Sequence, residues 1–225
     1  MKYTTLFLDL DNTLLDFDKA EEVAIEKVLK KYDLPHDEET IKLYSAINLS
    51  FWKRFEKGEI PKDAIFEGRF KKLLEELNED RNTALISDDY CGFLSEGYFV
   101  VDGAENILKY LKNKGYYICA TTNGFAFTQK KRVKYSGLEQ YFDKVFISED
   151  LGHQKPEKEY FDCVIDNIPE KNRKNILIVG DSQSSDILGG INSGIDTCWY
   201  NPHGDTSKYN TEFIINSLEE LKNIL

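Results

Sequence analysis

Carboxylate side chains recur at short spacing at two places in the chain, and both places follow apolar runs. Asp9 and Asp11 lie at the end of the run YTTLFLDL, and Asp181 follows NILIVG, with Asp186 one turn later. Two like charges roughly 4 Å apart repel by about 4 kcal/mol at an effective dielectric of 20. If the fold gathers these carboxylates, a cation must compensate them. An all-oxygen set of this kind favours Mg²⁺, which accepts one or two carboxylates together with waters and phosphate oxygens.

Three further polar residues follow apolar runs of the same kind. Thr122 and Asn123 come after YYICA, and Lys155 lies in the loop after KVFIS. A metal, a lysine and hydroxyl and amide donors can together hold a phosphoryl group and neutralise its transition state. Each segment alone is also typical of an ordinary turn or loop, since Asp, Asn and Gly are common there. Their order and their common position at the ends of apolar runs favour a shared site.

The patterns around these residues alternate between strand-like and helix-like. Short apolar runs typical of buried strands lie at 3–10, 116–120, 144–148, 175–181, 196–200 and 212–216. Helical segments are predicted at 104–115, 127–137, 156–167 and 185–194, and a closing helix is expected where Ser217 and Glu220 have capping-box spacing. This alternation predicts an α/β fold with a Rossmann-like parallel sheet wrapped on both faces. Ligands of such sheets bind beyond the carboxyl ends of the strands, where the polar residues fall.

A helical insertion interrupts this pattern after the first strand. A helical stripe covers 19–32, and helical character continues through 41–58 and 63–77, with no strand-like run between 17 and 95. The sequence therefore predicts a catalytic core formed by 1–16 and 97–225 and an all-α cap formed by 17–96. Hinges between them are expected near 16–18 and 96–102.

The bulk composition limits the class of protein. Of 225 residues, 41 % are hydrophobic and 13 % aromatic, which is enough for a packed core. The formal net charge of −11 argues against nonspecific binding to nucleic acid or to an anionic membrane. No basic leader precedes a long apolar run, and the four cysteines are far apart without a CxxC motif. We expect a cytoplasmic protein with reduced thiols and a small-molecule partner, as a monomer or homodimer.

The four polar segments resemble the four motifs of the haloacid dehalogenase superfamily of phosphohydrolases. The resemblance covers essentially the whole chain, and the pairing of DxDxT with GDxxxxD is highly specific. The helical insertion is similar to the cap of the first subclass of that superfamily. The matching residues are the run Asp9-Leu10-Asp11-Asn12-Thr13, Thr122 with Asn123, Lys155 before Pro156, and Gly180-Asp181 with Asp186.

The resemblance implies a role for each residue. Asp9 is implied to be the nucleophile that forms an aspartyl-phosphate, and Asp11 the acid and base that serves the leaving alkoxide and then water. Mg²⁺ is implied to be bound by Asp9, by the backbone carbonyl of Asp11 and by Asp181, with Asp186 supporting the site from behind. Thr122 and Asn123 are implied to hold phosphate oxygens, and Lys155 to neutralise charge at the nucleophile and the phosphoryl group.

Asp11 and the flanking segments narrow the activity. Dehalogenases of the superfamily lack an acid two residues after the nucleophile, so Asp11 points to phosphate chemistry. The stretches at 121–125, 136–162 and 179–190 are most similar to bacterial pyrimidine nucleoside 5′-monophosphatases. A sugar-phosphate phosphatase or phosphomutase would share the same catalytic residues and stays open. A binding module without catalysis would require a damaged site, whereas every expected position is filled.

The cap is expected to select the leaving group. The aromatic residues are candidates for stacking on a base, and the arginines for contacts to sugar or base oxygens. For each of these residues separately, packing of the cap or a place on its solvated face is the favoured interpretation. The candidates are Phe17, Trp52, Phe55, Phe66, Arg54 and Arg69.

Overall fold

The protein is divided into two compact units, each with its own core. The computed structural model describes residues 2–225. One unit combines the N-terminal segment up to Asp16 with Phe99–Leu225, and the other is Phe17–Tyr98. The helical unit thus extends two residues beyond the predicted range 17–96.

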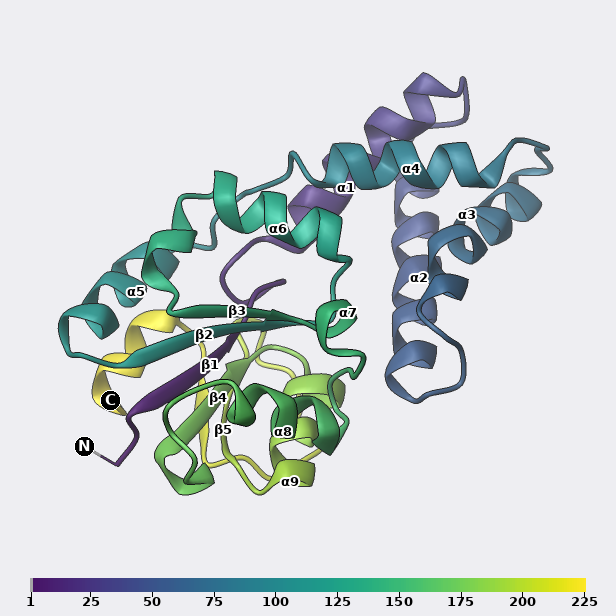
Figure 1. The fold of residues 1–225 in the computed structure, drawn as a ribbon. Helices are drawn as coiled ribbons and strands as arrows, with labels where there is room; N and C mark the ends of the chain where they lie inside the picture. Colours follow the sequence, from purple (N-terminus) through teal and green to yellow (C-terminus); the bar gives the residue numbers. More distant parts are fainter. Residues whose placement is uncertain (1) are drawn as a thin grey trace. The chain divides into compact units, whose positions relative to one another are not determined.

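The larger unit is built on a six-stranded sheet in which every pair of neighbours is parallel. The strand order is β3-β2-β1-β4-β5-β6, so the first strand lies in the middle of the sheet (Figure 1). This confirms the predicted parallel α/β fold. The strands are β1 (Thr5–Asp9), β2 (Tyr117–Thr122), β3 (Lys144–Ile147), β4 (Ile176–Gly180), β5 (Asp196–Tyr200) and β6 (Phe213–Ile215).

Alternate residues of the central strands enter different cores because successive side chains of a strand point to opposite faces. Leu6 and Leu8 of β1 pack in a cluster with residues of α5 (Ala104–Asn113) and of the C-terminal turn η4 (Leu218–Asn223). Phe7, between them, packs with residues of α8 (Lys158–Asp166) on the other face. Both faces of the sheet are therefore covered, which explains why its strands read as continuous apolar runs.

The connecting helices follow the predicted pattern, with two differences. The remaining connections are α6 (Ala126–Tyr135), η1 (Leu138–Tyr141), α7 (Ser148–Leu151), η2 (Arg173–Asn175), η3 (Gln183–Ile187) and α9 (Leu188–Ser193). The helix expected at 185–194 is split into a π-helical turn, η3, and a short α-helix, α9. The closing segment is a 3₁₀ helix, although the predicted capping box of Ser217 and Glu220 is present.

The smaller unit is entirely helical. It consists of α1 (Phe17–Lys31), α2 (Glu38–Glu56), α3 (Asp63–Leu77) and α4 (Thr83–Leu94). Asp37 and Asn82 cap the N-termini of α2 and α4 by accepting hydrogen bonds from Thr40 N and Leu85 N. Its core contains a cluster of three aromatic rings with centroid separations of 5.1 to 5.3 Å. Tyr44 and Phe70 are stacked, and Tyr90 meets both at a steep angle.

The two chain segments that connect the units are paired with each other. Asp16 N donates to Phe99 O at 2.9 Å, and Val101 N donates to Leu14 O at 3.0 Å. Gly97 N instead donates to Leu94 O, at the end of α4. Residues 97 and 98 therefore continue the helical unit, which accounts for the later boundary. Among residues 2–225, no helix has the length and apolar character needed to span a membrane.

Candidate active site

The carboxyl ends of three neighbouring strands bring the predicted site residues together. In the parallel register, Asp9 at the end of β1 is opposite Thr121 of β2, and Leu8 is opposite Val179 of β4. The polar residues that follow β2 and β4 thus flank Asp9 on both sides. This is the sheet edge where the sequence placed a ligand site.

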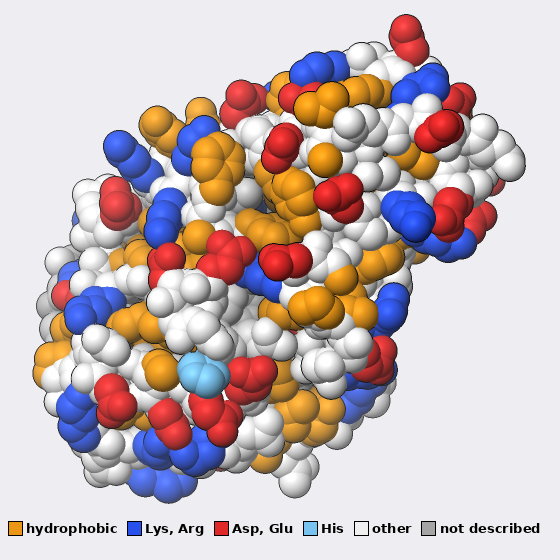
Figure 2. Space-filling model, turned by 45° about the vertical axis from the view of Figure 1, so that its right-hand side comes forward, with side chains coloured by type: hydrophobic (Ala, Val, Ile, Leu, Met, Phe, Trp, Pro, Cys, Tyr) orange, Lys and Arg blue, Asp and Glu red, His pale blue; other side chains and the backbone are white. Residues whose placement is uncertain are grey.

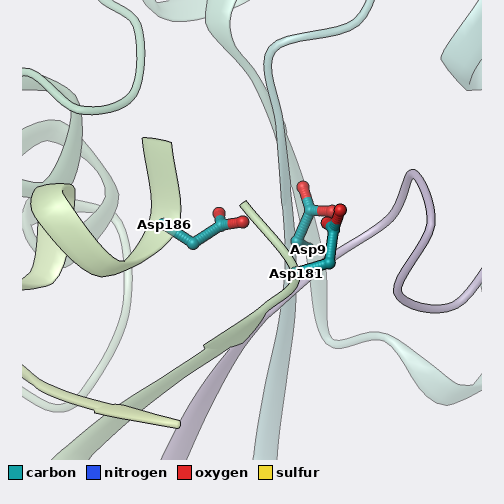
Figure 3. A group of neighbouring side chains, drawn as sticks. All are labelled: Asp9, Asp181 and Asp186. Carbon is teal, nitrogen blue, oxygen red and sulfur yellow. The ribbon is translucent and has the colours of Figure 1, made fainter. Parts of the chain in front are cut away.

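Three carboxylates converge at this edge. Asp9, Asp181 and Asp186 each offer an oxygen atom within 4.8 Å of the others, and Figure 3 shows Asp186 pointing toward Asp9 and Asp181. Lys155 lies among them: its Nζ donates to Asp9 Oδ1 at 2.6 Å, to Asp186 Oδ1 at 2.7 Å and to Thr121 O at 3.0 Å. The lysine is 1 % exposed, so these charges interact with little solvent screening.

Burial shapes the protonation of the group. It raises the pKa of Asp9 to about 7, and the charges of Asp186 and Asp11 add to this effect while Lys155 opposes it. Burial and the charges of Asp9 and Asp186 raise the pKa of Asp181 well above its usual range. Burial lowers the pKa of Lys155, but the carboxylates of Asp186 and Asp9 outweigh it and the net shift is upward. The site therefore keeps Lys155 cationic, and without a further cation it favours the protonated forms of Asp9 and Asp181.

The donor atoms fit a hard divalent cation. Both oxygens of Asp186 accept from protein donors, Lys155 Nζ and Ser182 N. One oxygen of Asp9 accepts a hydrogen bond from Lys155 Nζ, and one oxygen of Asp181 accepts from Thr13 Oγ1 at 3.2 Å. Asp9 and Asp181 thus retain carboxylate oxygens for Mg²⁺, whereas Asp186 is occupied in fixing Lys155. The roles expected for the three carboxylates stay a prediction.

Two residues hold the loop that carries Asp181. Asp181 N donates to Thr13 Oγ1 at 3.1 Å, in the first polar segment of the chain. Trp199 of β5 donates from Nε1 to the carbonyl oxygen of Asp181 at 2.8 Å. Thr13 is fully buried and Trp199 is nearly so. The backbone of Asp181 is therefore held by the segment after β1 and by β5.

Gly180 is required by the approach of Asp186. A Cβ atom at residue 180 would lie 2.3 Å from Asp186 Oδ2, closer than any real contact. The glycine before Asp181 therefore makes room for the carboxylate that fixes Lys155.

Asp11 is held apart from the three carboxylates. Its Oδ1 accepts a hydrogen bond from Arg132 Nη1, and its Oδ2 accepts from Gln129 Nε2 at 2.7 Å. Both partners belong to α6 and are buried. The side chain of Asp11 is 28 % exposed, so its carboxyl group borders solvent while being fixed from behind. Neither partner was predicted as a site residue.

Thr122 and Asn123 differ in what their side chains contact. Thr122 Oγ1 accepts from Gly124 N at 3.0 Å and from Gln129 Nε2 at 2.8 Å. Asn123 exchanges two hydrogen bonds with the backbone of Lys155: its Nδ2 donates to Lys155 O at 2.8 Å, and its Oδ1 accepts from Lys155 N at 2.9 Å. The side chain of Asn123 thus fixes the lysine loop, and its expected contact with phosphate stays a prediction.

The sequence contains only a weak indication of Gln129 and Arg132 as site residues. Gln129 and Arg132 are three apart and share a helix face with Val133, and all three are buried. Large polar residues on the buried face of a helix require hydrogen-bond partners. Periodicity alone does not reveal this, because the segment 127–137 is polar on most of its surface and the buried face cannot be identified.

The cap candidates separate into two groups. Phe55 is 2 % exposed and Arg69 1 %, so both belong to the core of the helical unit. Arg69 Nη1 donates to Asn48 Oδ1 at 3.0 Å, and Asn48 donates to the buried Glu21 at 2.6 Å. Packing, the favoured interpretation for these two, is what the structure shows. Phe17, Trp52, Phe66 and Arg54 are partly or fully exposed and stay candidates.

Comparison with known proteins gives a consistent family. The sequence profile of the haloacid dehalogenase-like hydrolases matches residues 6–200. The chain is 36 % identical to pyrimidine 5′-nucleotidase PynA of Streptococcus pneumoniae, over 90 % of this chain and 86 % of that protein. It is 32 % identical to pyrimidine 5′-nucleotidase YjjG of Escherichia coli, over 100 % and 99 %. The crystal structure of the HAD-hydrolase YfnB of Bacillus subtilis, bound to magnesium, matches with a TM-score of 0.94 at 38 % identity, over 100 % and 99 %. The chain therefore belongs to the haloacid dehalogenase-like hydrolase family.

Proposed function

We propose that this protein is a Mg²⁺-dependent phosphatase that hydrolyses small phosphate monoesters through an aspartyl-phosphate on Asp9. The observation that carries the proposal is Asp9 paired with the buried Lys155, beside Asp181, with Asp11 held separately two residues along the chain. A nucleophile and an acid-base group on one strand end, fixed by different partners, are what a two-step phosphoryl transfer requires.

In the first step, a carboxylate oxygen of Asp9 attacks phosphorus and the bond to the leaving oxygen breaks. Asp11 gives its proton to that oxygen, so that the product leaves as an alcohol. Lys155, bound to Asp9 Oδ1, stays cationic and offsets the charge that gathers around the transferring group. In the second step, Asp11 takes a proton from water, which attacks phosphorus and releases phosphate and the Asp9 carboxylate.

Asp9 and Asp181 would hold Mg²⁺, together with the backbone carbonyl of Asp11 that the resemblance implies. The ion, when bound, compensates the carboxylates and stabilises charge on the phosphoryl oxygens. Magnesium in the related YfnB structure supports this choice of metal.

Thr122 is well suited to hold phosphate. A hydroxyl group has one donor and two acceptor positions, and two N–H groups already donate to Thr122 Oγ1. Its O–H is therefore left to donate, and we assign it to a phosphoryl oxygen. The hydrogen bonds of Asn123 to Lys155 make it a positioning residue for the lysine in addition to its expected contact with phosphate.

Pyrimidine nucleoside 5′-monophosphates are the proposed substrates. The names of the relatives PynA and YjjG support this class, since the chain matches both over most of their length. The helical unit is the proposed cap, with Phe17, Trp52, Phe66 and Arg54 as candidates for contacts to the leaving group.

Acidic and basic side chains are interspersed on the face drawn in Figure 2, in keeping with a small-molecule partner. We place the enzyme in the cytoplasm, which suits its four free cysteines.

The test is phosphate release from a panel of nucleoside monophosphates and sugar phosphates, with Mg²⁺ and with EDTA. The wild-type protein is compared with Asp9→Asn. We expect Mg²⁺-dependent release that is strongest for UMP, dUMP or dTMP and that is lost in the variant. Phosphate release from sugar phosphates alone would be consistent with the proposed mechanism but would reject nucleoside monophosphates as the substrates. A wild-type protein without activity on any of these esters would contradict the proposal.

A further inference from the structure

Asp11 is fixed by two side chains of α6 that are themselves linked. Gln129 Nε2 donates to Asp11 Oδ2 at 2.7 Å, and Arg132 Nη1 pairs with Asp11 Oδ1. Arg132 Nη1 also donates to Gln129 Oε1 at 3.0 Å. Gln129 is 1 % exposed and Arg132 is fully buried, so both geometries are set by packing. The two oxygens of Asp11 therefore accept hydrogen bonds from two rigidly packed side chains on one face of α6.

Gln129 also reaches the phosphate-binding segment. The same Nε2 that holds Asp11 donates to Thr122 Oγ1 at 2.8 Å. Asp11 and Thr122 come from the ends of two neighbouring strands, β1 and β2. One amide group thus fixes the distance between the acid-base carboxyl and the hydroxyl assigned to phosphate.

Gly124 shows that this contact is built into the loop. A Cβ atom at residue 124 would lie 2.5 Å from Gln129 Nε2 and 2.6 Å from its Cδ. A side chain at this position would displace the amide of Gln129 from both Asp11 and Thr122. A glycine at residue 124 thus leaves the space that the side chain of Gln129 occupies.

We infer that Gln129 and Arg132 are positioning residues for the acid-base step: they aim the carboxyl group of Asp11 at the leaving oxygen of the substrate. The inference rests on the proposed function, because it requires Asp11 to be the proton donor. Proton transfer demands hydrogen-bond distance between the carboxyl group and the leaving oxygen. A carboxyl group that is free to rotate would meet this condition for only part of the time.

The leaving group separates a positioning role from a merely structural one. A nitrophenolate departs without a proton, whereas the alkoxide of a nucleotide needs one. The value of kcat/KM reports the steps up to release of the leaving group, before hydrolysis of the aspartyl-phosphate. Loss of positioning therefore lowers kcat/KM for an alkyl phosphate more than for p-nitrophenyl phosphate. A general loss of folded protein lowers both equally.

The experiment compares Gln129→Met, Arg132→Met and Asp11→Asn with wild type on p-nitrophenyl phosphate and on the best alkyl phosphate of the panel. Lys134→Met is the control, because it removes a positive charge from the exposed face of the same helix. We expect kcat/KM for the alkyl ester to fall about 10- to 100-fold in the two α6 variants, part of the 10²–10⁴ that acid catalysis supplies. For p-nitrophenyl phosphate we expect a change within about threefold, and the control should match wild type.

Equal losses on both substrates in Gln129→Met, or no loss on either, would overturn the inference. If Arg132→Met does not fold, Gln129→Met decides, since it keeps the volume and removes only the amide. If Asp11→Asn lowers kcat/KM more for the alkyl ester than for p-nitrophenyl phosphate, and Gln129→Met does not, the positioning role of Gln129 is rejected. Asp11 then remains the proton donor. If Asp11→Asn lowers kcat/KM equally for both substrates, Asp11 is not the proton donor. The positioning role of Gln129 and Arg132 is then rejected as well.

Discussion

Asp9 is 6 % exposed, and its carboxyl group lies beside two other carboxylates and one ammonium group. Burial dominates the upward shift of its pKa, from 3.8 to about 7. In the metal-free protein the folded state therefore binds more protons than the unfolded state between these values. Stability must then fall as pH rises through this window and stay reduced above it.

Asp9→Asn tests this cost at the residue that does the chemistry. The variant should lose phosphatase activity, and without metal at pH 8 it should be more stable than wild type by a few kcal/mol, at about 1.4 kcal/mol per pKa unit. The measurement is urea unfolding in EDTA at several values of pH. The difference between the two proteins should be small near pH 4 and grow toward pH 7. A difference that does not change with pH would contradict this account.

Lys155→Met removes the cation that joins Asp9 and Asp186. Breaking a buried ion pair typically costs about 3–5 kcal/mol, because the remaining charges stay buried without a partner. We expect that loss in the unfolding free energy measured in EDTA, and loss of phosphate release. Lys130→Met is the matched control: Lys130 pairs with Asp150 at 3.0 Å on the surface, and its removal should cost less than about 1 kcal/mol. Equal costs for the two variants would show that burial is not what matters.

At the scale of elements, the sheet edge works because loops after neighbouring strands hold one another. Thr13, after β1, binds the loop after β4, and Asn123, after β2, clamps the loop that carries Lys155. The site is therefore fixed by contacts between loops as well as by the strands beneath them.

Gly180→Ala tests how tightly β4 is fitted to η3. The added methyl group would displace Asp186 and, with it, one partner of Lys155. We expect a loss of stability of about 1–3 kcal/mol, typical of overpacking, and a decrease in kcat. Gly92→Ala in α4 is the control, because its methyl group would meet no atom within 4 Å beyond its chain neighbours and its own helix backbone. That variant should be neutral or stabilised by up to about 1 kcal/mol in thermal unfolding. Wild-type kcat in Gly180→Ala would refute the close fit.

At the scale of the whole molecule, the two units have separate cores. The larger unit has apolar clusters on both faces of its sheet, and the smaller has the aromatic group of Tyr44, Phe70 and Tyr90. Asp9 and Asp181, the carboxylates proposed to hold Mg²⁺, both belong to the larger unit, as does Asp186. Metal binding should therefore stabilise that unit directly.

Thermal unfolding with and without Mg²⁺ tests this assignment. A ligand that binds only the folded state stabilises by RT ln(1 + [L]/Kd), about 2.7 kcal/mol at a hundredfold excess over Kd. We expect Tm to rise with Mg²⁺ concentration in wild type and to be insensitive to it in Asp181→Asn. Asp205→Asn, at an exposed site in the loop after β5, should respond as wild type does. An equal response in Asp181→Asn would place the ion elsewhere.

The sequence by itself determined the alternation of strands and helices, the helical insertion and the strand ends at which Asp9, Thr122 and Asp181 stand. These features depend on local periodicity, on turn residues and on the rule that ligands meet the carboxyl ends of parallel strands. It also allowed the family resemblance, because the motif residues lie close together within each segment.

Only the tertiary structure decided which polar groups meet. Gln129 and Arg132 lie 118 and 121 residues from Asp11, and Asn123 lies 32 from Lys155, so no local pattern links them. Arg69 likewise could not be placed from a local pattern. Its residue type made it a candidate for substrate contact, and its burial in the structure makes it a core residue. Side-chain pairing of this kind follows from strand order and helix rotation, which the packing of the complete chain sets.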